Sequence, residues 1–126
     1  MKFIEKNPPR TFEVGYDKKG IISDCGSMYL EADEQITLFT EAGGEYDVTK
    51  KDWGFYATPS LNGRLAGFKL KAVLTKNRYD RYFIMILEEG KEESFQKYVD
   101  EEPLHIVAWL DSNENLQSLD KKLNLF

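Results

Sequence analysis

Residues 53–87 decide the fold of this chain and read WGFYATPSLNGRLAGFKLKAVLTKNRYDRYFIMIL. The Asn62-Gly63 dipeptide lies between two apolar runs and predicts a hairpin turn, because both central positions of a type I′ turn need positive φ. Apolar and polar residues alternate from Phe68 to Thr75, which is the pattern of a strand with one apolar face. Residues 82–87 are apolar throughout and too short to indicate a helix, so they predict a strand in the middle of a sheet that is covered on both faces. The core is therefore expected to be a hairpin plus a central strand.

Short strands are also predicted in the N-terminal half of the chain. They recur at intervals of roughly 8–12 residues with turn-forming residues between them, a spacing typical of antiparallel β proteins. Pro8 and Pro9 are expected to interrupt strand pairing, and Gly26 is expected to mark a bulge or a corner. The predicted fold class is mainly β, an antiparallel β-sandwich or barrel, with residues 1–111 forming a single β-rich domain.

One α-helix is predicted near the C-terminal end, over about residues 91–102. Apolar residues there follow helical spacing, and Pro103 supplies a stop. An apolar strand at residues 105–110 follows, which leaves two alternatives open. Either this strand pairs in parallel with residues 82–88, or the helix caps one end of an antiparallel barrel. Residues 112–126 are predicted as a C-terminal tail with one apolar helical face, made of Leu116, Leu119, Leu123 and Phe126.

The composition excludes several classes of partner. The formal net charge is −5, from 22 acidic and 17 basic residues spread along the chain, so nucleic acid is not an expected partner. The N-terminus lacks the apolar segment of a secretory signal, and no apolar run approaches the ~20 residues needed to span a bilayer, so no membrane partner is expected. A cytoplasmic location is predicted. Cys25 is the single cysteine and is expected to be a small buried hydrophobic residue.

The sequence offers no pattern typical of a catalytic or metal-binding site. His105 is the only histidine, whereas a zinc or iron site usually needs two or three. It lies in an apolar predicted strand and is expected to belong to the core. Cys25 or Ser23 would have to recruit His105 from across the fold to become an activated nucleophile. We therefore predict no catalytic residue, no metal and no cofactor.

The most distinctive set of residues combines aromatic rings with planar polar groups. A sugar ring presents an apolar C–H face surrounded by hydroxyls, so its sites pair an aromatic platform with amide, carboxylate or guanidinium groups. The alternative is that the aromatic residues pack in a β core. The predicted ligand-binding residues are Trp53, Tyr56, Asn62, Arg64 and Arg78.

Three segments carry a resemblance to other proteins: GSMYLEADEQITL at 26–38, WGFYATPSLNGRL at 53–65, and the ending that runs from GKEE at 90–93 to VAWL at 107–110. In these segments the chain resembles a group of small, uncharacterised bacterial proteins that are often encoded among genes for surface glycans, beside sugar-modifying enzymes. The resemblance covers most of residues 11–111. It implies a setting in polysaccharide or glycan biosynthesis and supplies no catalytic residues.

These observations predict a non-catalytic binding or accessory domain of glycan metabolism that recognises a sugar or sugar nucleotide. One alternative is a structural adaptor or oligomerising subunit that forms a homodimer through an edge strand or through the C-terminal tail. Another is a small barrel enzyme, such as a sugar isomerase or epimerase, with Tyr, Asp or Glu as proton carriers.

Overall fold

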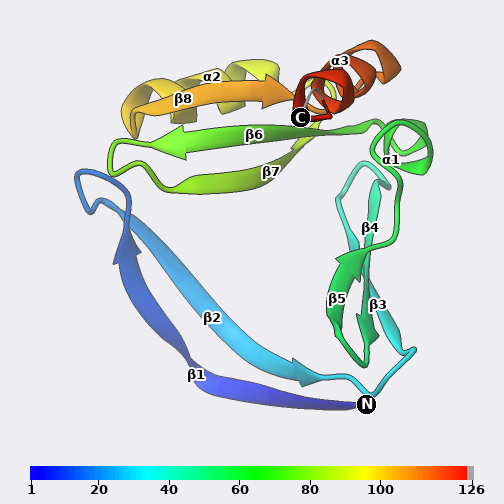
Figure 1. Cartoon of the computed structure of the whole chain (residues 1–126). Coiled ribbons are helices and arrows are strands. Elements are labelled where there is room, and N and C mark those ends of the chain that lie inside the picture. The colour runs from blue at the N-terminus through cyan, green and yellow to red at the C-terminus, as the bar shows by residue number, and fades with distance from the viewer. Residues whose placement is uncertain (125–126) are drawn as a thin grey trace. The chain divides into compact units, whose positions relative to one another are not determined.

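The computed structural model describes residues 1–124 and shows a mainly β chain with three small antiparallel sheets (Figure 1). The first sheet pairs β1 (Lys2–Val14) with β2 (Gly20–Tyr29). The second has the order β3-β4-β5, with β3 (Gln35–Phe39), β4 (Glu45–Lys51) and β5 (Gly54–Ala57). The third has the order β7-β6-β8, with β6 (Leu70–Asn77), β7 (Tyr82–Glu88) and β8 (Leu104–Trp109). The predicted mainly β fold is confirmed. The barrel alternative is wrong, because none of these sheets closes on itself within the described residues.

Three helices accompany the strands, where the sequence predicts one with a helical pattern in the tail. They are α1 (Arg64–Gly67), α2 (Glu92–Glu101) and α3 (Asn113–Leu123). α2 confirms the helix predicted over residues 91–102, and α3 shows that the tail is helical. Phe126, the last member of the predicted apolar face, lies outside the described residues. None of the helices within residues 1–124 is long and apolar enough to cross a membrane.

The chain divides into two compact units. The first contains residues 1–37 and 47–58, and the second contains residues 38–46 together with the chain from Pro59 onward. Among the described residues, every apolar side chain that is fully buried belongs to the second unit. The first unit instead buries polar side chains, those of Asp47 and Thr49.

The β1–β2 hairpin of the first unit is antiparallel and irregular in its middle. The strands are joined by a turn at residues 15–19, in which an Asp17 carboxylate oxygen accepts a hydrogen bond from the Lys19 amide at 3.1 Å. The pairing register shifts between Glu5 and Arg10, the stretch that contains Pro8 and Pro9. The extra residues belong to β1, and Gly26, where the sequence predicts a bulge or a corner, is paired with Glu5 at the border of this irregularity.

The third sheet corrects the predicted position of its strands. β6, not β7, is the central strand, and Ala72, Val73 and Thr75 of β6 have no exposed surface. β7 is an edge strand of this sheet, and the side chains of its first residues, 82–84, are exposed. β8 pairs with β6 in the antiparallel direction, so the alternative of a parallel pairing with residues 82–88 is wrong.

The Asn62-Gly63 dipeptide does not form the predicted hairpin turn. Gly63 has φ −133°, outside the positive range of a type I′ turn, and the chain continues into α1. The Ser60 hydroxyl accepts a hydrogen bond from the Arg64 amide at 3.2 Å, and Leu65 on the next position is completely buried. Burial of Leu65 therefore outweighs the local turn preference. The hairpin turn of this region lies between β6 and β7, where the Asn77 side chain accepts two backbone hydrogen bonds.

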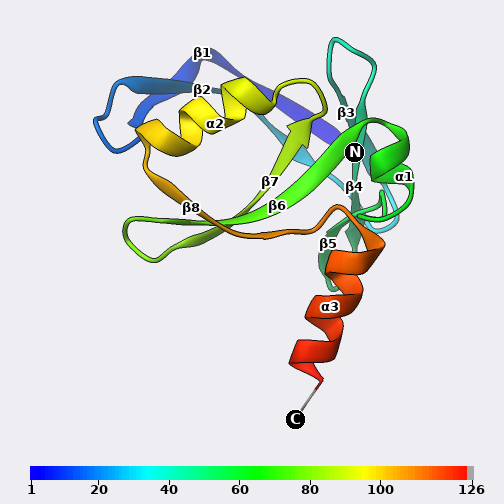
Figure 2. The same cartoon turned by 90° about the horizontal axis from the view of Figure 1, so that it is seen from above.

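The second unit has its core on one face of the third sheet. Leu65, Leu70, Ala72 and Leu110 form the buried cluster. α2 covers the other face of this sheet, the one that carries Trp109 (Figure 2). The contact includes an edge-to-face pair of Phe95 and Trp109, 6.2 Å between ring centroids.

Candidate functional site

The residues predicted to bind a ligand are distributed over both units. Trp53 and Tyr56 belong to the first unit, whereas Asn62, Arg64 and Arg78 belong to the second. The site is therefore built from the first unit, where the aromatic residues lie, and the polar residues are described within their own unit.

Trp53 and Tyr56 form an exposed aromatic pair on the β4–β5 hairpin. Asp52 and Trp53 are the two turn residues of this hairpin, since Lys51 pairs with Gly54. The rings of Trp53 and Tyr56 are stacked, with centroids 6.1 Å apart and an interplanar angle of 25°. Trp53 is 68% exposed and Tyr56 is 45% exposed. The alternative that Trp53 packs in a core is therefore wrong.

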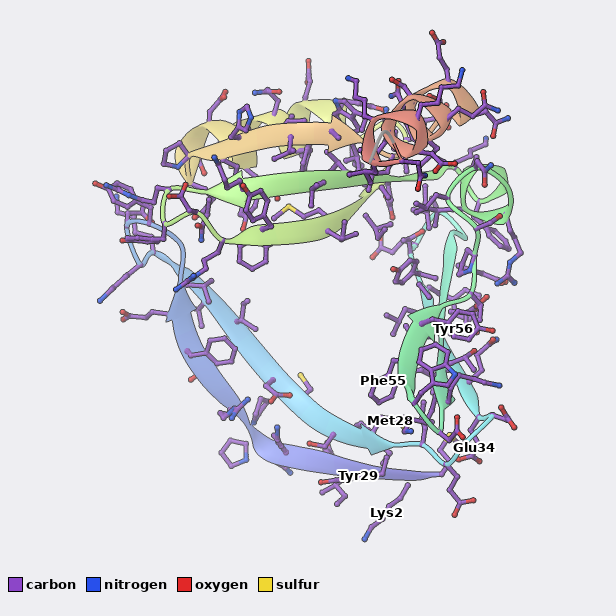
Figure 3. All side chains as sticks on the ribbon, in the orientation of Figure 1. Lys2, Met28, Tyr29, Glu34, Phe55 and Tyr56 are labelled. Atoms are coloured by element: carbon purple, nitrogen blue, oxygen red, sulfur yellow. The ribbon has the colours of Figure 1, made fainter. Side chains whose placement is uncertain are left out.

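Phe55 lies between these two residues in sequence but leaves the hairpin on the opposite side from Tyr56 (Figure 3). This follows from the alternation of side chains along a strand. Phe55 is 62% exposed, and the Lys50 ammonium lies 5.6 Å from the centre of its ring. The hairpin thus carries one stacked aromatic pair and, on its other side, a single aromatic ring beside a cation.

Polar contacts hold the base of the Trp53–Tyr56 pair. Thr49, which pairs with Tyr56 across the strands, donates a hydrogen bond to the Gln35 side chain at 3.0 Å. The Lys51 ammonium donates to an Asp33 carboxylate oxygen at 2.5 Å. This hydrogen bond is the main cause that raises the pKa of Lys51, whose ammonium lies beside the aromatic pair. The platform is therefore exposed on its outer side and anchored by neighbouring strands.

In the second unit, Asn62 and Arg64 lie together at the start of α1. The Asn62 amide donates a hydrogen bond to the Asn113 side chain, the first residue of α3, at 2.7 Å. Arg78 lies in the turn after β6, with its guanidinium 5.6 Å from the ring centre of Tyr79. β6 separates it from α1 by about 25 Å at ~3.3 Å per residue. The structure therefore brings Asn62 and Arg64 together and leaves Arg78 apart from both.

Two residues predicted to be buried are exposed instead. Cys25 is exposed on β2, because the first unit has no apolar core that could cover it. His105 is exposed on β8, which is an edge strand of the third sheet. Within residues 1–124, no group of three or more His, Cys, Asp or Glu side chains is placed to share a metal ion.

A charged cluster occupies the middle of the β1–β2 hairpin. One Asp24 carboxylate oxygen accepts hydrogen bonds from the Lys6 ammonium at 2.5 Å and from the Arg10 guanidinium at 2.9 Å. The hydrogen bond from Lys6 is the largest cause that lowers the pKa of the Asp24 carboxyl. Asp24 therefore links the two parts of β1 that flank the bulge.

Sequence reasoning missed a groove between β8 and α3 in the second unit. It has a volume of about 460 Å³. Its lining residues come from both elements: Ile106, Val107, Ala108, Trp109, Leu110, Asn115, Ser118, Leu119 and Lys122. The helical spacing of leucines in the tail was the signal that α3 would pack here. That spacing could not show that the packing would leave a concave strip that is mainly apolar, with Asn115, Ser118 and Lys122 as its polar members.

Comparison of the chain with protein-family models, with curated proteins and with solved structures finds no match.

Proposed function

We propose that this protein is a non-catalytic binding domain that recognises a carbohydrate, either a sugar or a sugar nucleotide, through the Trp53–Tyr56 platform. The observation that carries the proposal is the exposure of two stacked aromatic rings on an anchored hairpin. The setting in glycan biosynthesis that the sequence resemblance implies is part of the same proposal.

The exposure of Trp53 supports a binding role for physical reasons. A large aromatic side chain in water forgoes the free energy of burial, roughly 25 cal/mol for each Å² of apolar surface. A ligand with an apolar face recovers this free energy when it covers the ring. The C–H face of a sugar has the right size and polarity, since its hydroxyls stay at the rim and remain hydrated.

Polar groups around the platform suit the rim of such a ligand. Lys51 lies beside Tyr56 and forms an ion pair with Asp33. An ammonium and a carboxylate in this position can donate to and accept from hydroxyl groups, and the ammonium can also face the phosphate of a sugar nucleotide. The rings themselves are the proposed contact, since Trp53 is 68% exposed and Tyr56 is 45% exposed.

We also propose that the sheets pack as a sandwich, as the sequence predicts. Binding at the β4–β5 hairpin does not depend on it, because the anchoring contacts of the platform lie inside the first unit.

The proposal is tested by fluorescence titration with a panel of monosaccharides, oligosaccharides and nucleotide sugars. A Trp109→Phe background leaves Trp53 as the single tryptophan, so a saturable change in emission reports on the platform. The Trp53→Ala variant lacks the fluorescent reporter, so its binding is measured by NMR chemical-shift changes. We expect this substitution to weaken binding roughly tenfold, which corresponds to the loss of about 1.4 kcal/mol that one stacking contact can supply.

Phe55→Ala is the matched control, because Phe55 is an exposed aromatic residue of the same hairpin on its other side. It is expected to leave the affinity unchanged. The absence of saturable binding for every compound of the panel would contradict the proposal, as would an equal loss of binding in the Trp53→Ala and Phe55→Ala variants.

A further inference from the structure

The outer edge of β2 is the basis of a second inference, independent of carbohydrate binding. β1 and β2 form a two-stranded sheet, so within the described residues β2 pairs with β1 alone. A two-stranded hairpin is marginally stable in water unless further strands or a packed face support it. The first unit has no fully buried apolar side chain to provide that support. Its hairpin is therefore incomplete as a sheet.

The two edges of this hairpin differ in how they are protected. Proteins block exposed edge strands with proline and with charged residues. β1 has both, since it contains Pro8, Pro9 and five charged residues: Lys2, Glu5, Lys6, Arg10 and Glu13. β2 contains no proline, and Asp24 is its single charged residue. The edge of β2 is thus open to strand pairing, whereas the edge of β1 is not.

We propose that β2 pairs in the antiparallel direction with β2 of a second copy of this chain, about a two-fold axis at Cys25. The result is one four-stranded sheet with β1 at both edges. A two-fold axis perpendicular to the sheet leaves each side chain on the same face in both copies, and directly opposite residues must also share a face. The axis must therefore lie between one residue and the same residue of the second copy, not between two neighbouring positions.

The sequence of β2 favours the axis at Cys25. This register pairs residues 21–29 with residues 29–21 of the second copy. Asp24 then faces Gly26, which has no side chain, and Ile22 faces Met28. An axis one residue earlier would place the two Asp24 carboxylates opposite each other, and like charges directly opposite are destabilising. Charge therefore favours the axis at Cys25 over the axis at Asp24.

The same register brings together the exposed apolar side chains of β2. Ile21 is 70% exposed and faces Tyr29, which is 59% exposed. Tyr29 and Met28 leave β2 on opposite sides (Figure 3), so apolar pairs form on both faces of the new sheet. Each pair occurs twice by symmetry. Nine paired residues also supply about as many backbone hydrogen bonds as a typical interface contains, roughly ten.

Cross-linking through Cys25 tests the position of the axis. Paired residues of antiparallel strands have Cα atoms about 4.5–5.5 Å apart, which is within the range of a disulfide. Diamide accepts two electrons and two protons from a pair of thiols as the disulfide forms. We expect it to link the wild-type chain into a covalent dimer. In the control, Cys25→Ser/Ile21→Cys, the single thiol lies about 26 Å from its counterpart, at ~3.3 Å per residue, and no specific cross-link is expected.

Charge substitutions at Ser23 and Ser27 test the pairing, since these residues face each other across the axis. Light scattering of the wild-type chain is expected to give twice the monomer mass of 14.6 kDa. Ser23→Glu/Ser27→Glu places carboxylates opposite carboxylates and is expected to weaken dimerisation about tenfold or more. Ser23→Lys/Ser27→Glu changes the same two positions, places opposite charges across the axis, and is expected to remain a dimer.

Four results would overturn the proposal: a monomeric wild-type chain, a dimer that both double variants leave intact, loss of the dimer in both double variants, or a dimer in which Cys25 does not cross-link. Because the two double variants change the same positions, loss of the dimer in both of them would indicate damage to the hairpin and would also count against the register. Sugar titration of each variant separates this proposal from the proposed function, since Trp53 lies on a different hairpin.

Discussion

Truncation of Leu65 to alanine should unfold the second unit more readily than any surface change of the same kind. Leu65 has no exposed surface and lies in the buried cluster with Leu70, Ala72 and Leu110. It is also the buried residue of α1, a helix of four residues. One turn of helix is not stable by itself, so α1 depends on this side chain.

The expected loss follows from burial and from how far the site can relax. Replacing a buried leucine by alanine costs about 2–5 kcal/mol, with the larger values where a cavity persists. Leu70 and Ala72 are held in the central strand of the sheet, so they cannot move to fill the space, whereas α1 can. We therefore expect a loss of about 3 kcal/mol in the free energy of unfolding. For a chain of this length that corresponds to a fall in Tm of roughly 10 °C.

The assay is urea unfolding followed by tryptophan fluorescence in a Trp53→Phe background. Trp109 then reports on the second unit alone. Leu123→Ala is the matched control, because Leu123 is also a helical leucine but is 67% exposed. Its expected effect is within about 0.5 kcal/mol of zero. The reasoning is refuted if Leu65→Ala costs less than about 1 kcal/mol, or if the two alanine variants unfold at the same urea concentration.

Two further predictions concern the β1–β2 hairpin. Gly26→Ala should destabilise the hairpin by about 1–3 kcal/mol, because an added Cβ would lie 2.5 Å from the Phe3 ring and 2.8 Å from the Ile4 carbonyl oxygen. Amide hydrogen exchange in β1 and β2 would show this loss of stability, and unchanged protection of these amides would contradict the prediction. The pKa of Asp24 is lowered in the folded chain, chiefly by the Lys6 hydrogen bond. Its contribution to stability is therefore present above the unfolded value, near 4, and is lost as the pH falls through the folded value. Thermal melts between pH 6 and about 2.5 should show a steeper acid loss for wild type than for Asp24→Asn, and parallel curves would rule the coupling out.

Local sequence patterns predicted the elements better than their places in the sheets. The alternation after Phe68 predicted β6, and the helical spacing before Pro103 predicted α2, because both signals depend on neighbours in sequence. The apolar run at residues 82–87 was interpreted as a central strand, yet β7 is an edge strand with its first residues exposed. A run of apolar residues shows that a strand is hydrophobic and does not show which strands will flank it.

The hairpin turn predicted at Asn62-Gly63 was wrong for a related reason. Its turn preference is worth little against the burial of Leu65, two residues later, and only the folded chain shows that this leucine reaches the core. The aromatic part of the candidate site was predictable, since Trp53 and Tyr56 do lie together. Their exposure was not predictable, because aromatic residues of a β core and of a binding platform have the same sequence pattern.

The distribution of buried side chains connects the two proposals. The second unit has an apolar core and a helix packed on its sheet, whereas the first unit has exposed apolar side chains on two hairpins and buries polar groups. Hydrophobic burial is the main favourable contribution to folding, so the first unit depends on what covers it more than the second unit does. Its two exposed features differ in kind. The edge of β2 offers backbone hydrogen bonds over a proline-free strand of ten residues, which another strand can satisfy, while the Trp53–Tyr56 pair offers ring faces at a turn and on β5, an edge strand of only four residues. A protein strand therefore suits the first feature and a ligand with a flat apolar face suits the second, which is why we assign the two surfaces to different partners.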